Sequence, residues 1–266
     1  MASAASSARL TISALDGHRA SALLCGGACH VERSLARNRP HPPKSPRGVM
    51  KILKCDDLKK NPSLYREVAT VLEEGGVVVF PGHSSYRLAV AALSEEAVAK
   101  LQQAKRRVQN TPALVFLKDR QQLSEFVDDL PEVARQLMAT FWPGQLTIRF
   151  EPSEKVPSKI RKALAKATGK IGFRIPTSDV GREIVRAFGR PLLISSANRS
   201  KKSGAQSIAQ VRKNFGNLAD LILDDGDLAQ GSSSTIVDVS SEGWSMVREG
   251  SISGRELTEK IGMPPT

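Results

Sequence analysis

The sequence predicts an α/β protein in which helices connect the strands of a mixed sheet. From residue 57 onward, segments of helical period alternate with short apolar runs typical of buried strands, a pattern that favours parallel strand pairs. Two strand-like segments, 235–240 and 245–250, then follow each other with no helix between them, which indicates an antiparallel pair. No internal repeat is visible, so we expect a single domain.

Local signals place the expected elements in order. A helix begins at Asn61-Pro62 and ends at Gly75-Gly76, because proline suits the first helical turn and glycine ends helices. Ser94 is the expected N-cap of a helix over 94–107. The remaining expected helices cover residues 130–142, 178–189, 207–216 and 254–262, and the expected strands cover residues 77–80, 112–117, 146–150, 170–176, 190–197, 219–224, 235–240 and 245–250.

The N-terminal segment differs from the rest of the chain. Its first 48 residues are rich in Ala and Ser, with seven Lys or Arg and only two acids, Asp16 and Glu32. This composition is typical of an organelle transit peptide, and a disordered tail without an address is the alternative. The opening MASAASSARL favours the chloroplast over the mitochondrion. We therefore expect a transit peptide and linker over 1–49 and a folded domain over 50–266.

Composition narrows the classes of site that the domain can hold. No stretch approaches the roughly 20 apolar residues of a membrane-spanning helix, so no membrane anchor is expected. Beyond the N-terminal segment, His83 is the one histidine and Cys55 the one cysteine of the sequence. Neither a typical zinc site nor a disulfide framework is therefore expected, and Cys55 should be a buried apolar residue. The same part keeps 32 basic and 25 acidic residues, a net charge of +7, which suits nucleotides, phosphates or RNA, or a solubilising surface.

Three polar stretches and one arginine are candidate site elements, and each could also have a purely structural role. The basic stretch 105–107 ends a helix, where it can complement the helix dipole or bind a polyphosphate. The Ser and Asn of 195–198 follow a strand, where ligand sites gather and turns also form. Arg174 lies within an apolar strand and needs an anion, either an Asp or Glu of the protein or a ligand. The hydroxyl-rich 232–235 can cradle phosphate or form a surface turn.

Taken together, these stretches resemble YrdC-like threonylcarbamoyl-AMP synthases. KRRVQNTPAL is similar to the family's Lys-x-Arg motif, and SSANRS is similar to its Ser-x-Asn motif. Further matches follow in the family's order: WPGQLT (142–147), GFRIP (172–176), SSSTIVDV (232–239) and VREGSI (247–252). The resemblance covers about residues 55–252 and implies an α/β domain whose twisted mixed sheet and flanking helices surround a basic cavity.

The resemblance also implies a reaction and a set of site residues. Family members condense L-threonine, bicarbonate and ATP into threonylcarbamoyl-adenylate and release pyrophosphate, and Mg²⁺ is expected with the ATP. By motif match, Arg174 faces the threonine carboxylate, and Ser84 and Tyr86 orient the amino acid. Lys105 and Arg107 are the expected catalytic cations that offset developing charge. The residues expected to hold ATP are Lys105, Arg107, Thr147, Ser196, Asn198, Ser234 and Arg248.

The expected partners follow from the same resemblance. The adenylate feeds the t6A modification of tRNA, so a downstream t6A transferase would receive the product. The basic charge adds tRNA or double-stranded RNA as a further expected partner class.

One motif differs from the family's usual pattern. Residues 81–90, PGHSSYRLAV, are expected to form an active-site loop, where the family usually shows Pro-Thr-Asp-Thr-x-Tyr-Gly-Leu. Here Gly82 replaces a hydroxyl residue, His83 an acid and Arg87 a glycine, which makes the pocket more positive. Two alternatives therefore stand beside the synthase: an enzyme that activates a different carboxylated amine, and a catalytically diverged paralogue that binds RNA or nucleotide.

Overall fold

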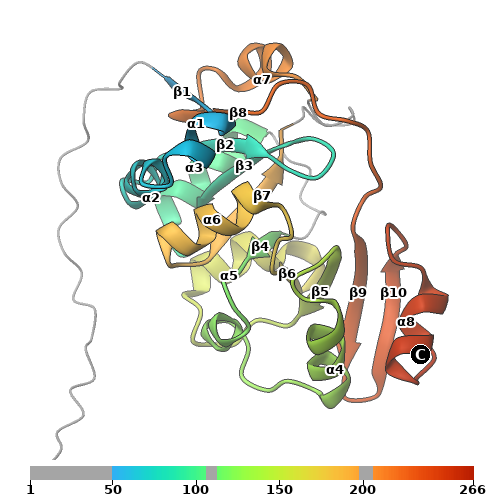
Figure 1. The fold of residues 1–266 in the computed structure, drawn as a ribbon. Helices are drawn as coiled ribbons and strands as arrows, with labels where there is room; N and C mark the ends of the chain where they lie inside the picture. Colours follow the sequence, from blue (N-terminus) through green and yellow to red (C-terminus); the bar gives the residue numbers. More distant parts are fainter. Residues whose placement is uncertain (1–49, 106–112, 198–205) are drawn as a thin grey trace, which may run out of the picture. The chain divides into compact units, whose positions relative to one another are not determined.

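The structure is a computed structural model that describes residues 50–105, 113–197 and 206–266 (Figure 1). Its strands are β1 (Lys51–Lys54), β2 (Val78–Pro81), β3 (Tyr86–Ala91), β4 (Leu114–Phe116), β5 (Leu146–Phe150), β6 (Ile171–Arg174), β7 (Leu192–Ser196), β8 (Leu221–Asp224), β9 (Thr235–Ser240) and β10 (Gly243–Arg248). Its helices are α1 (Cys55–Lys60), α2 (Leu64–Glu73), α3 (Glu95–Lys105), α4 (Glu132–Phe141), α5 (Ser158–Ala165), α6 (Asp179–Phe188), α7 (Ile208–Phe215) and α8 (Gly254–Ile261), with 3₁₀ turns η1 (Gln121–Glu125) and η2 (Lys166–Thr168).

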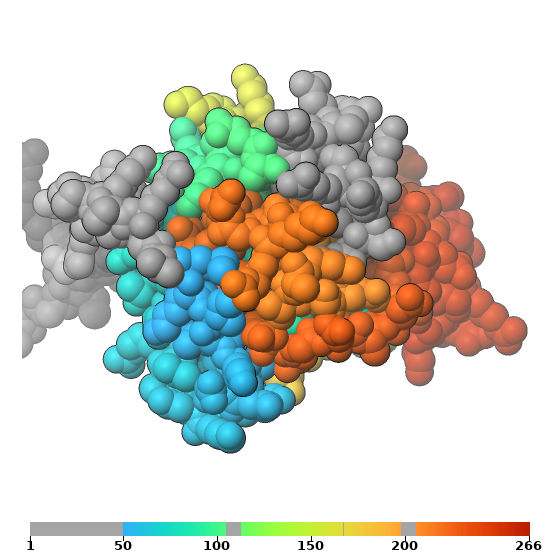
Figure 2. Space-filling view, turned by 90° about the horizontal axis from the view of Figure 1, so that it is seen from above, coloured from blue at the N-terminus to red at the C-terminus, as the bar shows by residue number. Residues whose placement is uncertain are grey.

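The strands form one sheet in the order β1-β8-β2-β3-β7-β4-β6-β5-β9-β10. The pairs β1/β8, β8/β2, β4/β6 and β5/β9 are parallel, and the pairs β2/β3, β3/β7, β7/β4, β6/β5 and β9/β10 are antiparallel. The predicted mixed α/β sheet and its late antiparallel pair are therefore confirmed. Strand β1 pairs with β8, a strand distant in sequence, and Figure 2 shows the blue N-terminal part of the domain beside orange residues from the C-terminal part of the chain.

Apolar side chains cover both faces of the sheet. The core on one face joins the sheet to α1, α2 and α6, and the core on the other face joins it to α3, α4 and α5. Cys55 lies in the first core at 1% exposure, and burial raises the pKa of its thiol to about 12, which confirms the expected apolar role. Within the described ranges, no helix has the length and apolar character needed to cross a bilayer.

The local signals missed strands β1 and β3 and helices α1 and α5. Strand β3 corrects the prediction for 81–90, because only residues 82–85 form the turn between β2 and β3. Tyr86 and Leu88 enter one core and Ala89 enters the other, so the strand is buried on both faces. Such a strand shows no polar alternation, and its alanines carry little β-propensity.

Candidate active site

Arg174 is a buried cation without a carboxylate partner among the described residues. It ends β6, and the residue is 8% exposed. Its Nη1 donates to Oε1 of Gln145 at 2.9 Å, and its guanidinium lies 5.0 Å from the centre of the Phe116 ring. Its Nε is buried, with no hydrogen-bond partner in the part of the chain that the structure describes. Of the two sequence-based alternatives, the structure therefore favours a ligand anion over a structural acid.

Gln145 is a site residue that sequence reasoning missed. The peptide before Pro143 is cis, the Gly144 N–H donates to the Ile175 carbonyl at 3.1 Å, and the Gln145 carbonyl accepts from the Thr235 N–H at 3.0 Å. These contacts fix the backbone on both sides of Gln145, so its amide can orient Arg174. The sequence did hold a signal for Gln145, because the residue lies in the matched WPGQLT motif. Within that motif only Thr147 was assigned to the site.

Thr147 lies on β5 close to Gly172 of β6. Its side chain is buried at 4% exposure, and its Oγ1 has no hydrogen-bond partner among the described residues. A Cβ at Gly172 would lie 2.9 Å from the Thr147 methyl carbon, so the absent side chain of Gly172 makes room for Thr147. A role for this hydroxyl in binding ATP stays a prediction.

Ser234 and Arg248, two of the predicted ATP-binding residues, contact each other. Arg248 donates from Nε and Nη2 to the Ser234 carbonyl at 3.1 and 2.7 Å, and from Nη2 to the Ser234 Oγ at 3.2 Å. Thr235 fixes the segment 250–252, which follows Arg248. Its Oγ1 donates to the Ile252 carbonyl and accepts from the Gly250 and Ile252 N–H groups. Cationic and hydroxyl groups therefore share the edge formed by β9 and β10.

The turn at residues 82–85 packs against the segment that connects β8 to β9. A Cβ at Gly231 would lie 3.3 Å from both Ser84 Cβ and His83 Cδ2, and Figure 1 shows the β2–β3 turn pointing toward this orange segment. The Tyr86 hydroxyl donates to the Gly226 carbonyl at 2.7 Å and accepts from the Asp225 N–H at 3.0 Å. Tyr86 thus anchors the connecting segment.

These contacts bear on the predicted substrate roles of Ser84 and Tyr86. Burial raises the pKa of Tyr86 to about 12, so its hydroxyl stays protonated at neutral pH. Ser84 is partly buried beside the connecting segment. Direct contact of either residue with substrate stays a prediction.

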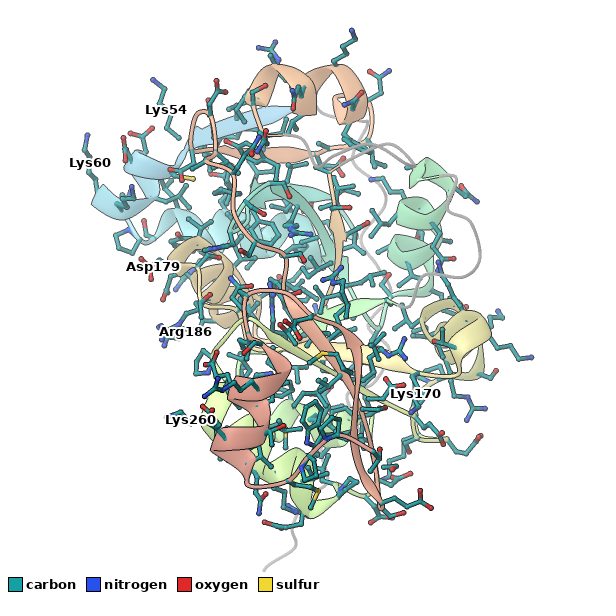
Figure 3. All side chains as sticks on the ribbon, turned by 90° about the vertical axis from the view of Figure 1, so that its right-hand side faces the viewer. Lys54, Lys60, Lys170, Asp179, Arg186 and Lys260 are labelled. Carbon is teal, nitrogen blue, oxygen red and sulfur yellow. The ribbon has the colours of Figure 1, made fainter. Side chains whose placement is uncertain are left out.

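Arg87 joins Arg174 and Arg248 in one electrostatic cluster. Burial lowers the pKa of all three guanidinium groups, and that of Arg174 falls to about 10 because Arg87 and Arg248 add repulsion. Arg248 also lowers the pKa of Arg87. Other cations differ from this cluster, because the side chains of Lys54, Lys60, Arg186 and Lys260 extend outward from the ribbon (Figure 3). The cluster combines the buried Arg174 and the partly buried Arg87 with the exposed Arg248, and its positive charge suits an anionic ligand.

Three of the predicted site residues lie at the end of a described range or outside the described ranges. Lys105 is the last residue of α3, and its side chain is not described. Arg107 and Asn198 lie outside the described residues. Ser196 ends β7 directly opposite Arg87 of β3, which places it beside the arginine cluster.

Gly82 is tightly coupled to Arg87, and we expect Gly82→Ala to destabilise the protein by about 1–3 kcal/mol. An added Cβ would lie 2.6 Å from the Ser85 carbonyl oxygen and 2.9 Å from the Arg87 Cγ. Urea unfolding of Gly82→Ala, Arg87→Gly and the double variant measures the coupling. We expect a smaller Gly82→Ala cost when residue 87 is glycine, with part of the cost remaining through Ser85. Costs that add to within about 0.5 kcal/mol would contradict this coupling.

The comparisons with known proteins agree with the fold and motifs. The family model for Sua5, YciO and YrdC proteins, which carries the description telomere recombination, matches residues 70–250. The chain is 30% identical over 197 residues to the threonylcarbamoyl-AMP synthase of Pyrococcus abyssi, covering 74% of this chain and 57% of that protein. It is 28% identical over 207 residues to the Bacillus subtilis enzyme, covering 78% and 59%. The chain thus spans little more than half the length of these two relatives.

A shorter relative and two solved structures extend the match. The putative threonylcarbamoyl-AMP synthase of Mycobacterium leprae is 30% identical over 214 residues, covering 80% of this chain and 95% of that protein. The crystal structure of P. abyssi Sua5 complexed with L-threonine has a TM-score of 0.70 at 28% identity, covering 82% of this chain and 62% of that one. Escherichia coli YciO shares the fold, with a TM-score of 0.67 at 22% identity, covering 78% and 98%. This protein belongs to the Sua5/YciO/YrdC family.

Proposed function

We propose that this protein is a threonylcarbamoyl-AMP synthase, which makes threonylcarbamoyl-adenylate from L-threonine, bicarbonate and ATP. The observation that carries the proposal is the cluster of Arg87, Arg174 and Arg248, for which no carboxylate partner occurs among the described residues. The reaction brings together a carboxylate, a carbamate and a triphosphate, and such a cluster can bind these anions. The names of the relatives and the threonine bound to P. abyssi Sua5 support the same choice over an RNA-binding paralogue.

The proposed mechanism needs no covalent enzyme intermediate. Bicarbonate first carboxylates the threonine nitrogen with loss of water. A carbamate oxygen then attacks the α-phosphorus of ATP, a new P–O bond forms, and the bond from the α-phosphorus to the bridging oxygen breaks to release pyrophosphate. Arg174, held by Gln145, would fix the threonine carboxylate and so orient the nitrogen. Lys105, Arg107 and Arg248 would offset the charge that develops on the phosphates.

We propose that Mg²⁺ enters bound to ATP and is not held by a protein carboxylate site. Within the described ranges, no three His, Cys, Asp or Glu side chains gather in a way that could hold a metal ion. Hydroxyl groups such as that of Ser234 would then contact the phosphate oxygens around the ion. Bound this way, Mg²⁺ would neutralise part of the triphosphate charge.

We propose the surrounding partners and location from the same activity. A downstream transferase would take the adenylate for t6A modification of tRNA, and the basic surface would serve any direct contact with RNA. Residues 1–49 would direct the chain to the chloroplast, with the mitochondrion as the alternative. Uptake of a fluorescent protein fused to residues 1–49 by isolated chloroplasts, and not by mitochondria, tests this location.

The activity test uses the full chain with ATP, Mg²⁺, L-threonine and ¹⁴C-bicarbonate. We expect release of pyrophosphate and formation of a labelled adenylate in equal amounts, both dependent on threonine. Omission of threonine is the matched control, and replacement of threonine by serine and by other amines tests selectivity. ATP binding without either product, in the presence of threonine, would overturn the proposed activity and return the choice to the diverged paralogue.

A further inference from the structure

Arg87 is a partly buried cation to which the mechanism above gives no specific role. It lies on β3, directly opposite Ser196 of β7 on one side and Phe80 of β2 on the other. Residues that face each other in antiparallel strands point to the same face, with Cβ atoms about 5 Å apart. The Arg87 side chain therefore starts beside Ser196, a residue expected to hold the nucleotide.

Two aromatic rings connect Arg87 to Arg174 on the same face of the sheet. The Phe80 ring, opposite Arg87, meets the Phe116 ring edge to face with centroids 6.4 Å apart. The Arg174 guanidinium lies over the other ring of this pair, 5.0 Å from the Phe116 centroid. Arg87 thus flanks the Phe80 end of the pair and Arg174 the Phe116 end. In the strand order β3-β7-β4-β6, Ser196 of β7 lies next to Arg87 on the side toward Arg174, so Arg87 neighbours the proposed nucleotide residue and is an electrostatic neighbour of the proposed carboxylate-binding residue.

The missing side chain of Gly82 makes room for the Arg87 stem. A Cβ at Gly82 would lie 2.9 Å from Arg87 Cγ and 3.0 Å from its Nε. The turn that contains Gly82 packs against Gly231, in the segment where Arg248 holds Ser234. The Arg87 stem therefore packs over Gly82, in a turn whose residues His83 and Ser84 contact the connecting segment.

Among the residues that the structure describes, the cluster has no compensating acid. No Asp or Glu of the described ranges acts as an electrostatic neighbour of Arg87, Arg174 or Arg248. The stretches 106–112 and 198–205 contain no Asp or Glu in their sequence. Three neighbouring cations that repel one another favour a bound anion, because the anion removes the repulsion and replaces the hydration that Arg174 and Arg87 lose on burial.

The chemistry of the proposed reaction identifies which anion remains for Arg87, and this step rests on the proposed function. The threonine carboxylate is assigned to Arg174 and the phosphates to the nucleotide residues. The third anion is the carboxylate that bicarbonate supplies. This group becomes bonded to the threonine nitrogen and then to the α-phosphorus, so it must lie between the amino acid and the nucleotide.

We propose that Arg87 binds the carboxylate derived from bicarbonate, first as bicarbonate and then as the carbamate of threonine. The planar guanidinium donates hydrogen bonds to the carboxylate while one oxygen stays directed at the α-phosphorus. Its charge offsets the repulsion between the carbamate and the phosphates as they approach. Arg87 forms and breaks no covalent bond, so the bond changes are those of the reaction given above.

Steady-state kinetics of the full chain in CO₂-depleted buffer test the proposal, with bicarbonate, threonine and ATP varied in turn. We expect Arg87→Gln to raise the KM for bicarbonate at least about tenfold, the loss expected when one charge-assisted hydrogen bond is removed, with the KM values for threonine and ATP within about twofold. Arg87→Lys should recover part of the loss. Arg190→Gln is the matched control, because Arg190 is an exposed arginine outside the cluster, with its guanidinium 4.7 Å from the Phe188 centroid. It should leave all three KM values unchanged.

Other outcomes would overturn the proposal. A raised KM for ATP with an unchanged KM for bicarbonate would assign Arg87 to the phosphates. Faster turnover of an acidic amino acid than of threonine, reversed in Arg87→Gln, would assign Arg87 to the substrate side chain.

A binding measurement keeps the proposal separate from the proposed function. If the unmodified chain makes no adenylate with threonine, the proposed function fails regardless of Arg87. ¹³C NMR of labelled bicarbonate with the unmodified chain and with Arg87→Gln then decides the matter. Line broadening only with the unmodified chain supports the site, and equal spectra overturn it.

Discussion

Replacement of Arg174 by leucine is expected to lower kcat/KM for threonine by roughly 100- to 1,000-fold without destabilising the protein. The loss follows from removing the charged hydrogen bonds proposed for the threonine carboxylate. Stability should hold or rise, because Arg174 is a buried cation without a carboxylate partner among the described residues and its pKa is lowered by burial and by two neighbouring arginines. Pyrophosphate-release kinetics and urea unfolding of the same preparation measure both effects.

Arg149→Leu is the matched control for Arg174→Leu. Arg149 donates to both carboxylate oxygens of Asp238 at 2.5 and 2.7 Å, and Lys170 lies 3.3 Å from the same carboxylate. Removing Arg149 leaves Asp238 only partly compensated, so we expect a loss of about 1–3 kcal/mol in the free energy of unfolding and an unchanged KM for threonine. A structural role for Arg174 would make the two variants behave alike, and that result would contradict its assignment to a ligand.

Thr235→Val is expected to lower the free energy of unfolding by roughly 3–6 kcal/mol. Thr235 is fully buried, and its hydroxyl makes three hydrogen bonds, to the Ile252 carbonyl at 2.6 Å and from the Gly250 and Ile252 N–H groups at 3.0 Å each. Valine keeps the shape but leaves these three backbone groups unpaired. Thermal unfolding should show a Tm lower by about 6–24 °C, given roughly 2–4 °C per kcal/mol for a domain of this size.

Thr235→Ser separates the hydroxyl from the methyl group in this test. Serine keeps the three hydrogen bonds and loses one buried methyl group, so we expect a cost of about 1 kcal/mol. Valine should also raise the KM for ATP more than serine does, because the segment after Arg248 is tied down through Thr235. Equal stability of the valine and serine variants would show that these hydrogen bonds contribute little.

The sequence predicted most of the fold because its signals were local. Helix α6 shows this, since Ser178, the first residue of the expected helix 178–189, is its N-cap and accepts from the Gly181 N–H, and its C-cap Gly189 has a φ of 72°. Strand β3 escaped prediction because burial on both faces removes the alternation that marks a half-buried strand. Strand β3 pairs with β2 and β7, and neither hydrophobic periodicity nor β-propensity predicts which strands pair with each other.

By itself, the sequence determined the α/β class, the order of the motifs and the need of Arg174 for an anion. Only the tertiary structure decided that Gln145 orients Arg174, that the Tyr86 hydroxyl anchors a segment 139–140 residues away, and that Arg87 extends over Gly82 beside Ser196. The physical reason is that periodicity and capping act between neighbours along the chain. The positive charge of this site instead arises where strands distant in sequence come together and bring Arg87, Arg174 and Arg248 near one another.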